Sequence, residues 1–228
     1  PFVSKATGLS VAKIAAKVMA GMTLAELGCE SEPIPSHVSI KESVFPFRKF
    51  VGVDIVLGPE MRSTGEVMGI SERFSIAFAK SQLAAGTLLP KEGTIFISVA
   101  PPAKEHMVGL AKRLADMGFK LMATEGTARR LESAGIQVQH VNKLQEGQPN
   151  LLDYLLDGAI QLIMNTPSGK GARTDEGRIR SAAVARGVPC ITTIQAADAA
   201  VRAMEALRDE EMTVQALQDR FAPVPLGK

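Results

Sequence analysis

Two threonines and a glycine suited to binding an anion lie in segment 124–127, whose sequence is Thr-Glu-Gly-Thr. The apolar segment 119–123 precedes them and the helix-compatible segment 128–134 follows, a pattern that predicts a strand, a tight loop and a helix. Unpaired N–H groups at the start of a helix bind anions, and hydroxyls beside a glycine suit a phosphate group. The alternative is that Thr124 and Thr127 only cap the helix. Taken alone, the segment favours capping.

Four other segments, each predicted to follow a strand, carry side chains suited to the same chemistry. These segments are 99–104, 141–143, 165–170 and 192–193, and their side chains include Lys104, Lys143, Asn165, Thr166, Ser168, Lys170 and Thr192. For an anionic ligand, cations supply charge, and hydroxyls and amides supply direction. Because ligands bind at the carboxyl ends of parallel strands, we expect these segments to converge, which favours a phosphate site over simple capping.

Alternating strands and helices position these segments in the second part of the chain. The expected strands are 94–99, 119–123, 136–141, 159–165 and 189–194, and the expected helices are 104–117, 128–134, 150–156, 174–186, 196–207 and 213–221. This order predicts an α/β fold with a mainly parallel five-stranded sheet flanked by helices.

The first part of the chain lacks this regular alternation. We expect helices at 11–19 and 23–27, an extended strand at 37–47, and a helix at 73–84 that Ser71 can cap. A proline and glycines between residues 86 and 93 mark a linker. The pattern therefore indicates an α+β part at 1–89, followed by the α/β part at 93–228.

The composition excludes several classes of function. The 228 residues are 46% hydrophobic and 22% charged, which is ordinary for a globular protein. Aromatic residues make up 4% and the net charge is +2, so we expect neither nucleic acid nor a membrane as partner. No apolar run reaches the length of a membrane span. Cys29 and Cys190 lack a CxxC spacing, which indicates buried thiols, no structural zinc and a reducing, cytoplasmic compartment.

Motifs in both parts resemble the C-terminal portion of the large subunit of the carbamoyl-phosphate synthetase family. The matching segments are 2–8, 46–47, 57–69, 141–143 and 165–169, in the family's order. The run 58–69, with the sequence GPEMRSTGEVMG, is long and specific. The resemblance implies that residues 1–89 are the tail of the second ATP-grasp half. It also implies that residues 93–228 form a regulatory domain of the methylglyoxal-synthase-like fold.

The resemblance further implies an activity and a set of partners. Enzymes of this family are ATP-dependent ligases that use magnesium or manganese, and potassium. They make carbamoyl phosphate from bicarbonate and glutamine-derived ammonia, for arginine and pyrimidine biosynthesis. A glutamine amidotransferase small subunit is their partner, and UMP or IMP binds the regulatory domain as effector.

The family's ATP-grasp metal ligands immediately precede the motif that stands here at residues 1–5. We therefore expect this chain to be one piece of the enzyme, which acts together with the remainder of the large subunit. Alone, we expect it to bind no cofactor and to lack catalytic activity.

The resemblance assigns effector contacts to residues near the predicted strand ends. The matching residues are Lys104, Thr124, Thr127, Lys143, Asn165, Thr166, Ser168, Lys170 and Arg180. Lys170 stands where an arginine is often found, which keeps the charge but loses the bidentate fork. Pro167 replaces a threonine and removes one hydroxyl.

Glu42 and Thr192 match two ornithine contacts of the family, whose other ornithine contacts lie upstream of this chain. We therefore do not expect ornithine to bind here. For Glu42 we favour a side chain that faces water or pairs with Lys41 or Arg48.

Two other functions are alternatives to a nucleotide-binding allosteric module. A phosphate lyase of the methylglyoxal synthase type needs a carboxylate base and an electrophilic group near the phosphate. Glu125 is the only carboxylate in the predicted phosphate loop, and His140 is not placed as an obvious catalytic acid. The second alternative is structural, with the helices of residues 1–89 docking the regulatory domain onto the synthetase. The pattern favours the allosteric module and leaves the docking role compatible with it.

Overall fold

In the computed structural model, the described residues of the first part of the chain form an antiparallel strand pair and three helices. The structure describes residues 1–45, 63–166 and 175–221. The elements of this part are α1 (Phe2–Thr7), α2 (Val11–Met19), β1 (Val38–Val44), β2 (Gly65–Ser71) and α3 (Phe74–Ala84). β1 and β2 pair along their whole length, and α3 covers the pair.

The second part of the chain forms a parallel five-stranded sheet. Its strands are β3 (Thr94–Val99), β4 (Lys120–Thr124), β5 (Gln139–Val141), β6 (Leu162–Thr166) and β7 (Cys190–Ile191), in the order β5-β4-β3-β6-β7. Every neighbouring pair is parallel, and at the centre Ile97 of β3 lies opposite Ala123 of β4 and Met164 of β6. The predicted α/β fold with a five-stranded parallel sheet is therefore confirmed.

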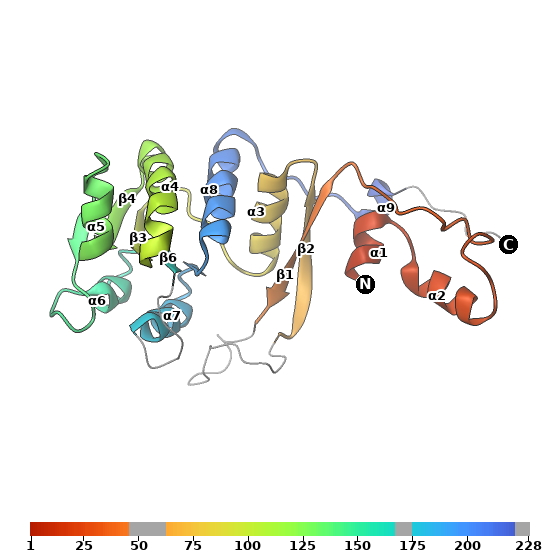
Figure 1. Ribbon diagram of the computed structural model, residues 1–228, viewed down its shortest axis with the longest axis horizontal. Helices are drawn as coiled ribbons and strands as arrows, with labels where there is room; N and C mark the ends of the chain where they lie inside the picture. The colour runs from red at the N-terminus through yellow and green to blue at the C-terminus, as the bar shows by residue number, and fades with distance from the viewer. Residues whose placement is uncertain (46–62, 167–174, 222–228) are drawn as a thin grey trace.

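Helices cover both faces of this sheet. They are η2 (Pro101–Ala103), α4 (Lys104–Asp116), α5 (Glu125–Glu132), α6 (Leu151–Leu156), α7 (Asp175–Arg186) and α8 (Ile194–Asp209), with α9 (Leu217–Arg220) near the C-terminus. Ile95 and Ile97 belong to one core with residues of α4, α5 and α8, whereas Phe96 packs with α6 and α7. This follows from strand geometry, because successive side chains point to opposite faces. Figure 1 shows α4, α5 and α8 on one side of the sheet and α6 and α7 on the other side.

Helix α3 joins the two parts of the chain. It packs against β2 and against α8, and Figure 1 shows it between the antiparallel pair and the parallel sheet. Gly69 permits the close approach to β2, because an added Cβ would lie 1.9 Å from the carbonyl oxygen of Ala77. Beyond α8, the Glu210 carboxylate accepts a hydrogen bond from Arg73 at 2.5 Å. The limits of 1–89 and 93–228 for the two parts stay a prediction.

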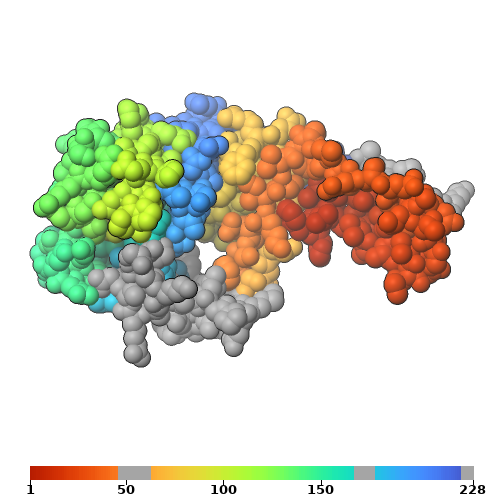
Figure 2. All heavy atoms as spheres, viewed as in Figure 1, coloured from red at the N-terminus to blue at the C-terminus, as the bar shows by residue number. Residues whose placement is uncertain are grey.

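The C-terminal segment returns to the N-terminal end of the molecule. The ring of Phe221 packs edge-on against His37, with centroids 5.7 Å apart, and also lies against Gly8. One ring nitrogen of His37 lies 2.7 Å from the carbonyl oxygen of Ala6. In Figure 2 this N-terminal region, coloured red and orange, forms the end of an elongated molecule opposite the green α5.

The chain near α2 differs from the prediction in two places. Residues 2–7 form a helix that was not expected, and residues 23–27 form a turn where a helix was expected. The Glu26 carboxylate accepts hydrogen bonds from the backbone N–H and the hydroxyl of Thr23, at 2.7 and 2.9 Å. Gly28, with φ of 64°, ends this turn before a second helical turn can form.

Elements near the edges of the fold are shorter than predicted. The strand expected at 189–194 is reduced to Cys190–Ile191, because β7 lies at the edge and pairs only with β6. The helix expected at 213–221 is reduced to the single turn of α9. Ser71 is not the N-cap of α3, a place that Arg73 takes, although the Ser71 hydroxyl accepts a hydrogen bond from Arg73 N–H at 3.3 Å.

Candidate anion-binding site

A cavity of about 250 Å³ opens at the carboxyl ends of the central strands of the parallel sheet. Six of the nine predicted effector residues line it, namely Lys104, Thr124, Thr127, Lys143, Asn165 and Thr166. Apolar residues such as Phe96 and Leu151 complete the wall. Polar groups that converge in a partly apolar hollow are typical of a small-molecule site. Of the other predicted residues, Ser168 and Lys170 lie outside the described residues and Arg180 does not line the cavity.

The start of α5 forms one side of the cavity. The helix begins at Glu125, directly after β4, so in place of the expected loop at 124–127 the strand ends at Thr124 and residues 125–127 start the helix. Thr124 occupies the N-cap position without a side-chain capping bond, and its hydroxyl lies 3.3 Å from the Ser98 hydroxyl. The buried Thr127 hydroxyl accepts a hydrogen bond from Val99 N–H at 3.4 Å. The capping interpretation is therefore wrong for both threonines, whose hydroxyls face β3.

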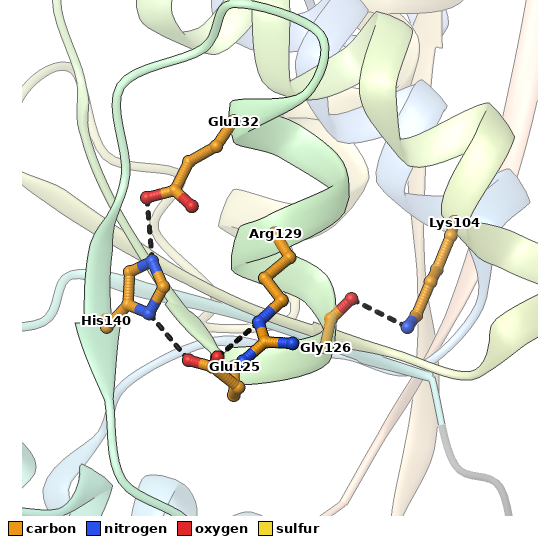
Figure 3. Close-up of polar contacts among 6 residues, drawn as sticks. All are labelled: Lys104, Glu125, Gly126, Arg129, Glu132 and His140. Atoms are coloured by element: carbon orange, nitrogen blue, oxygen red, sulfur yellow. Dashed lines mark hydrogen bonds and ion pairs between the residues drawn. The ribbon is translucent and has the colours of Figure 1, made fainter.

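Lys104 faces the same helical turn from the start of α4. Its ammonium nitrogen donates to the carbonyl oxygen of Gly126 at 2.7 Å, as Figure 3 shows. A Cβ added at Gly126 would lie 3.2 Å from that nitrogen, so the glycine leaves room for the lysine beside the backbone. This contact uses a neutral carbonyl rather than a carboxylate, which leaves the positive charge of Lys104 available to an anion.

Lys143 brings a second cation to the cavity from the segment after β5. Its ammonium forms an ion pair with Glu146 at 3.4 Å, and its backbone N–H donates to the same carboxylate at 2.9 Å. The backbone hydrogen bond is the main reason why the pKa of Glu146 is lowered. An anionic ligand would therefore compete with Glu146 for the Lys143 side chain.

The end of β6 supplies an acceptor and a structural hydroxyl. Asn165 is only 2% exposed, and its Oδ1 atom accepts no hydrogen bond from any of the described residues. The Thr166 hydroxyl accepts a hydrogen bond from Ala100 N–H at 2.9 Å, which ties η2 to the sheet. A buried oxygen without a partner is uncommon in native structures and indicates a place for a ligand or water donor.

A charged cluster stands outside the cavity, on the outer side of α5. The two ring nitrogens of His140 lie 2.7 Å from Glu125 and 2.7 Å from Glu132, and Glu125 also contacts Arg129 (Figure 3). These contacts raise the pKa of His140, with Glu132 as the larger cause, and lower the pKa of Glu125. Neither His140 nor Glu125 lines the cavity. This placement agrees with the argument against a methylglyoxal synthase type of chemistry.

The remaining predicted residues lie away from the cavity. Burial raises the pKa of Cys190 to about 11. The positive charge of Arg180, on α7, opposes this rise as the smaller of the two causes. Glu42 of β1 accepts a hydrogen bond from Gln82 of α3 at 2.9 Å. Burial raises the pKa of this Glu42 carboxyl. Of the two basic partners predicted as alternatives for Glu42, Lys41 instead forms an ion pair with Glu66 of β2, and Arg48 lies outside the described residues. Thr192, which follows β7, does not line the cavity either.

Sequence reasoning missed Ser98 and did not single out Asn142 within the predicted segment 141–143, and both line the cavity beside the predicted residues. Ser98 sits near the end of β3 and carries the signal of a polar residue in an otherwise apolar strand. Across residues 1–45, 63–166 and 175–221, the side chains form no group of three or more potential metal ligands of the His, Cys, Asp or Glu type. No helix within those ranges has the length and apolarity of a membrane span.

Comparison with known proteins gives two results. Residues 106–192 match the family described as the MGS-like domain.

Nearly the whole chain is similar to carbamoyl phosphate synthase large chains. Identity is 68% over 222 residues to the large chain of Rhodopirellula baltica, and the match covers 97% of this chain and 20% of the relative. Identity is 52% over 219 residues to that of Myxococcus xanthus, covering 96% of this chain and 20% of the relative. For the chloroplastic, arginine-specific large chain of Oryza sativa subsp. japonica it is 49% over 222 residues, covering 97% and 19%. The chain thus spans about a fifth of the length of these relatives.

Proposed function

This chain contains an MGS-like domain and corresponds along nearly its whole length to part of a carbamoyl phosphate synthase large chain, and from that premise we propose that its cavity binds a nucleotide effector. UMP and IMP are the effectors expected from the sequence. The phosphate group occupies the turn at the start of α5, and the nucleoside extends toward the rest of the cavity. In this role the chain is a regulatory part of the enzyme rather than its catalytic centre.

The observation that carries the proposal is the convergence of cationic and hydroxyl groups on the first turn of α5. Lys104 and Lys143 supply two positive charges, and Thr124 and Thr127 place hydroxyls at the same cavity. The unpaired N–H groups of a helix start and its positive dipole end stabilise a bound anion. Charge-assisted hydrogen bonds of this type are about twice as strong as neutral ones.

The nucleoside part of the ligand meets different chemistry. Asn165 Oδ1 accepts a hydrogen bond from a hydroxyl or N–H group of the ligand, which satisfies a buried atom that no donor of the described residues reaches. Apolar side chains such as Leu144 and Ile179 line the cavity and can pack against a ribose or base. A ligand with both a phosphate and donor groups therefore fits better than phosphate alone.

The wider role of the chain is proposed from its relatives. As part of an ATP-dependent carbamoyl phosphate synthase, it acts with the remainder of the large chain and with a glutamine amidotransferase small subunit. ATP with magnesium or manganese, and potassium, belong to the whole enzyme. Effector binding alters the distant active site only if the two states of the enzyme bind the effector with different affinity. Helix α3, packed between the antiparallel pair and α8, is the physical connection between the two parts of this chain.

Calorimetric titration of the chain with UMP and with IMP, at low phosphate and low ionic strength, tests the proposal. We expect saturable binding that inorganic phosphate competes away and that salt weakens. Lys143→Ala should weaken binding about tenfold, because a charge-assisted contact is lost. The matched control is Lys120→Ala, an exposed lysine at the start of β4, where the strand is furthest from the cavity. A folded chain that binds neither nucleotide at millimolar concentration would contradict the proposal.

A further inference from the structure

Glu125 opens α5 but stays outside the cavity that its two sequence neighbours line. Its carboxylate contacts the imidazole of His140 at 2.7 Å and the guanidinium of Arg129. Figure 3 shows these contacts on the side of the helical turn opposite Lys104. The only acidic residue of this first turn is therefore held away from the cationic groups of the cavity.

His140 is held between two carboxylates of the same helix. Its Nδ1 lies 2.7 Å from Glu125 Oε2, and its Nε2 lies 2.7 Å from Glu132 Oε1. Ionised carboxylates only accept hydrogen bonds, so both ring nitrogens must donate, which requires the protonated imidazolium. When the ring loses one proton, one of the two contacts must break.

The first turn of α5 attracts carboxylates as well as ligands. α5 has eight residues, and an acidic side chain near the start of a helix is stabilised by the dipole and by the free N–H groups. Asn165 lines the same cavity and is buried with an oxygen that meets no donor from the described part of the chain, which is an independent sign that a ligand belongs there. A Glu125 carboxylate released from His140 would move toward the N–H groups that an anionic ligand needs, and would repel that ligand.

We propose that His140 is a positioning residue, which in its protonated form holds Glu125 away from the anion site and in its neutral form lets this carboxylate compete with the ligand. The inference rests on the proposed function, because it concerns the regulation of the same cavity. Anion binding is then strongest at lower pH and weakens as the pH rises through the titration of His140.

Other charged groups also lie near His140. Arg129 contacts Glu125 from within α5. Lys143 and Glu146 pair with each other in the segment after β5, and the pKa of Glu146 is lowered. An imidazole, in contrast, changes charge in the physiological range.

Inorganic sulfate is the probe, because it stays a dianion across the pH range in which a phosphate monoester titrates. Its affinity for the chain is measured by calorimetry at constant, low ionic strength, from about pH 6 to about pH 9. We expect the affinity to fall about two- to fivefold across this range, the size of a helix-end charge effect.

Glu125→Gln removes the competing charge and should bind sulfate at all pH values with the affinity that the wild type has at low pH. His140→Gln should give a flat profile at the weak level.

Two further variants separate this effect from loss of structure. Glu132→Gln is the matched control, because it removes a His140 partner at the far end of α5 and leaves Glu125 intact. It should shift the midpoint of the profile to lower pH without changing the affinities at either end. The double variant Glu125→Gln/His140→Gln should bind like Glu125→Gln alone. NMR titration of the His140 ring gives the midpoint independently of binding.

The outcomes distinguish the two proposals. If sulfate binds and Glu125→Gln and His140→Gln both keep the wild-type pH profile, His140 does not position Glu125, while the anion site stands. If His140→Gln stays weak when Glu125→Gln is added, the histidine acts through the helix itself and the inference is wrong. If neither sulfate nor UMP binds at any pH, the proposed anion site is itself contradicted.

Discussion

Asn165 of β6 donates a hydrogen bond from Nδ2 to the carbonyl oxygen of Ser98 on β3, at 3.3 Å. This contact fixes the orientation of the amide, because only the nitrogen can donate to a carbonyl. Oδ1 is therefore the atom that meets no hydrogen-bond donor within residues 1–45, 63–166 and 175–221. An unsatisfied buried oxygen costs free energy, and a ligand that supplies a donor would remove this cost. The Asn165–Ser98 pair thus links β6 to β3 at the wall of the cavity.

Asn165→Asp should destabilise the chain at neutral pH and weaken anion binding. The new carboxylate cannot donate to Ser98, and it brings negative charge into the cavity. Burial raises its pKa above the unfolded value, so the penalty is small below the unfolded pKa and grows as the pH rises through the folded pKa. We expect a loss of about 1–3 kcal/mol at neutral pH. Urea unfolding at several pH values from acid to neutral measures this loss.

The matched control for that prediction is Asn142→Asp. Asn142 also lines the cavity but is exposed, so the added charge is solvated and should leave the free energy of unfolding nearly unchanged. It should still weaken anion binding by repulsion. Equal destabilisation by the two substitutions would show that the Asn165–Ser98 contact has no special role.

Lys104→Met should weaken nucleotide binding about tenfold or more, because one charge-assisted contact to the phosphate is removed. The aliphatic part of the side chain is retained, so the free energy of unfolding should change little. Lys112→Met is the control on the same helix, since Lys112 is exposed and pairs with Asp116 at 3.1 Å. Calorimetric titration of both variants with UMP measures the difference. Similar losses in the two variants would mean that general charge attraction, not a contact at the cavity, governs binding.

The convergence of Lys104, Thr124 and Asn165 was predictable from the sequence for a physical reason. Parallel strands place their carboxyl ends at one edge of the sheet, so residues that follow different strands must meet there. The identity of these strands followed from short apolar runs separated by helical patterns. For this reason the fold and the position of the cavity could be predicted without coordinates.

The orientation of individual side chains could not be predicted in the same way. Arg180 shares a helix with the buried Ile179, yet Ile179 lines the cavity and Arg180 does not, and the arginine charge instead lowers the pKa of Cys190. The contact of His140 with Glu125 depends on how β5 lies against α5, which no local pattern encodes. The ion pair between Lys41 of β1 and Glu66 of β2, which lie diagonally and not opposite each other on the ladder, is likewise a tertiary property.

Gly69→Ala should destabilise the packing of α3 against the antiparallel pair. Its Cβ would lie 1.9 Å from the carbonyl oxygen of Ala77 and 2.5 Å from Ser81 N, both backbone atoms that cannot move without shifting α3. We expect a loss of about 2 kcal/mol in the free energy of unfolding, the usual cost of overpacking. Gly65→Ala on the same strand is the control, because its Cβ would meet no atom within 4 Å. Urea unfolding followed by circular dichroism compares the two. A midpoint for Gly69→Ala equal to that of the control would contradict the close approach.

Cys190 should resist alkylation in the folded chain. Burial raises the pKa of its thiol from 9.0 to about 11, so at mildly alkaline pH the reactive thiolate is about a hundredfold rarer than in the unfolded chain. Iodoacetamide labelling at about pH 8, read by mass spectrometry, should therefore modify Cys190 slowly in buffer and rapidly in urea.

Arg180→Gln should slow the labelling of Cys190 further, because the arginine charge partly lowers the pKa of this thiol. The neighbouring exposed Arg178→Gln is the control and should leave the rate unchanged. Rapid labelling of Cys190 in the folded wild type would show that the space between β7 and α7 is open to solvent and would also remove the reason for the Arg180 effect.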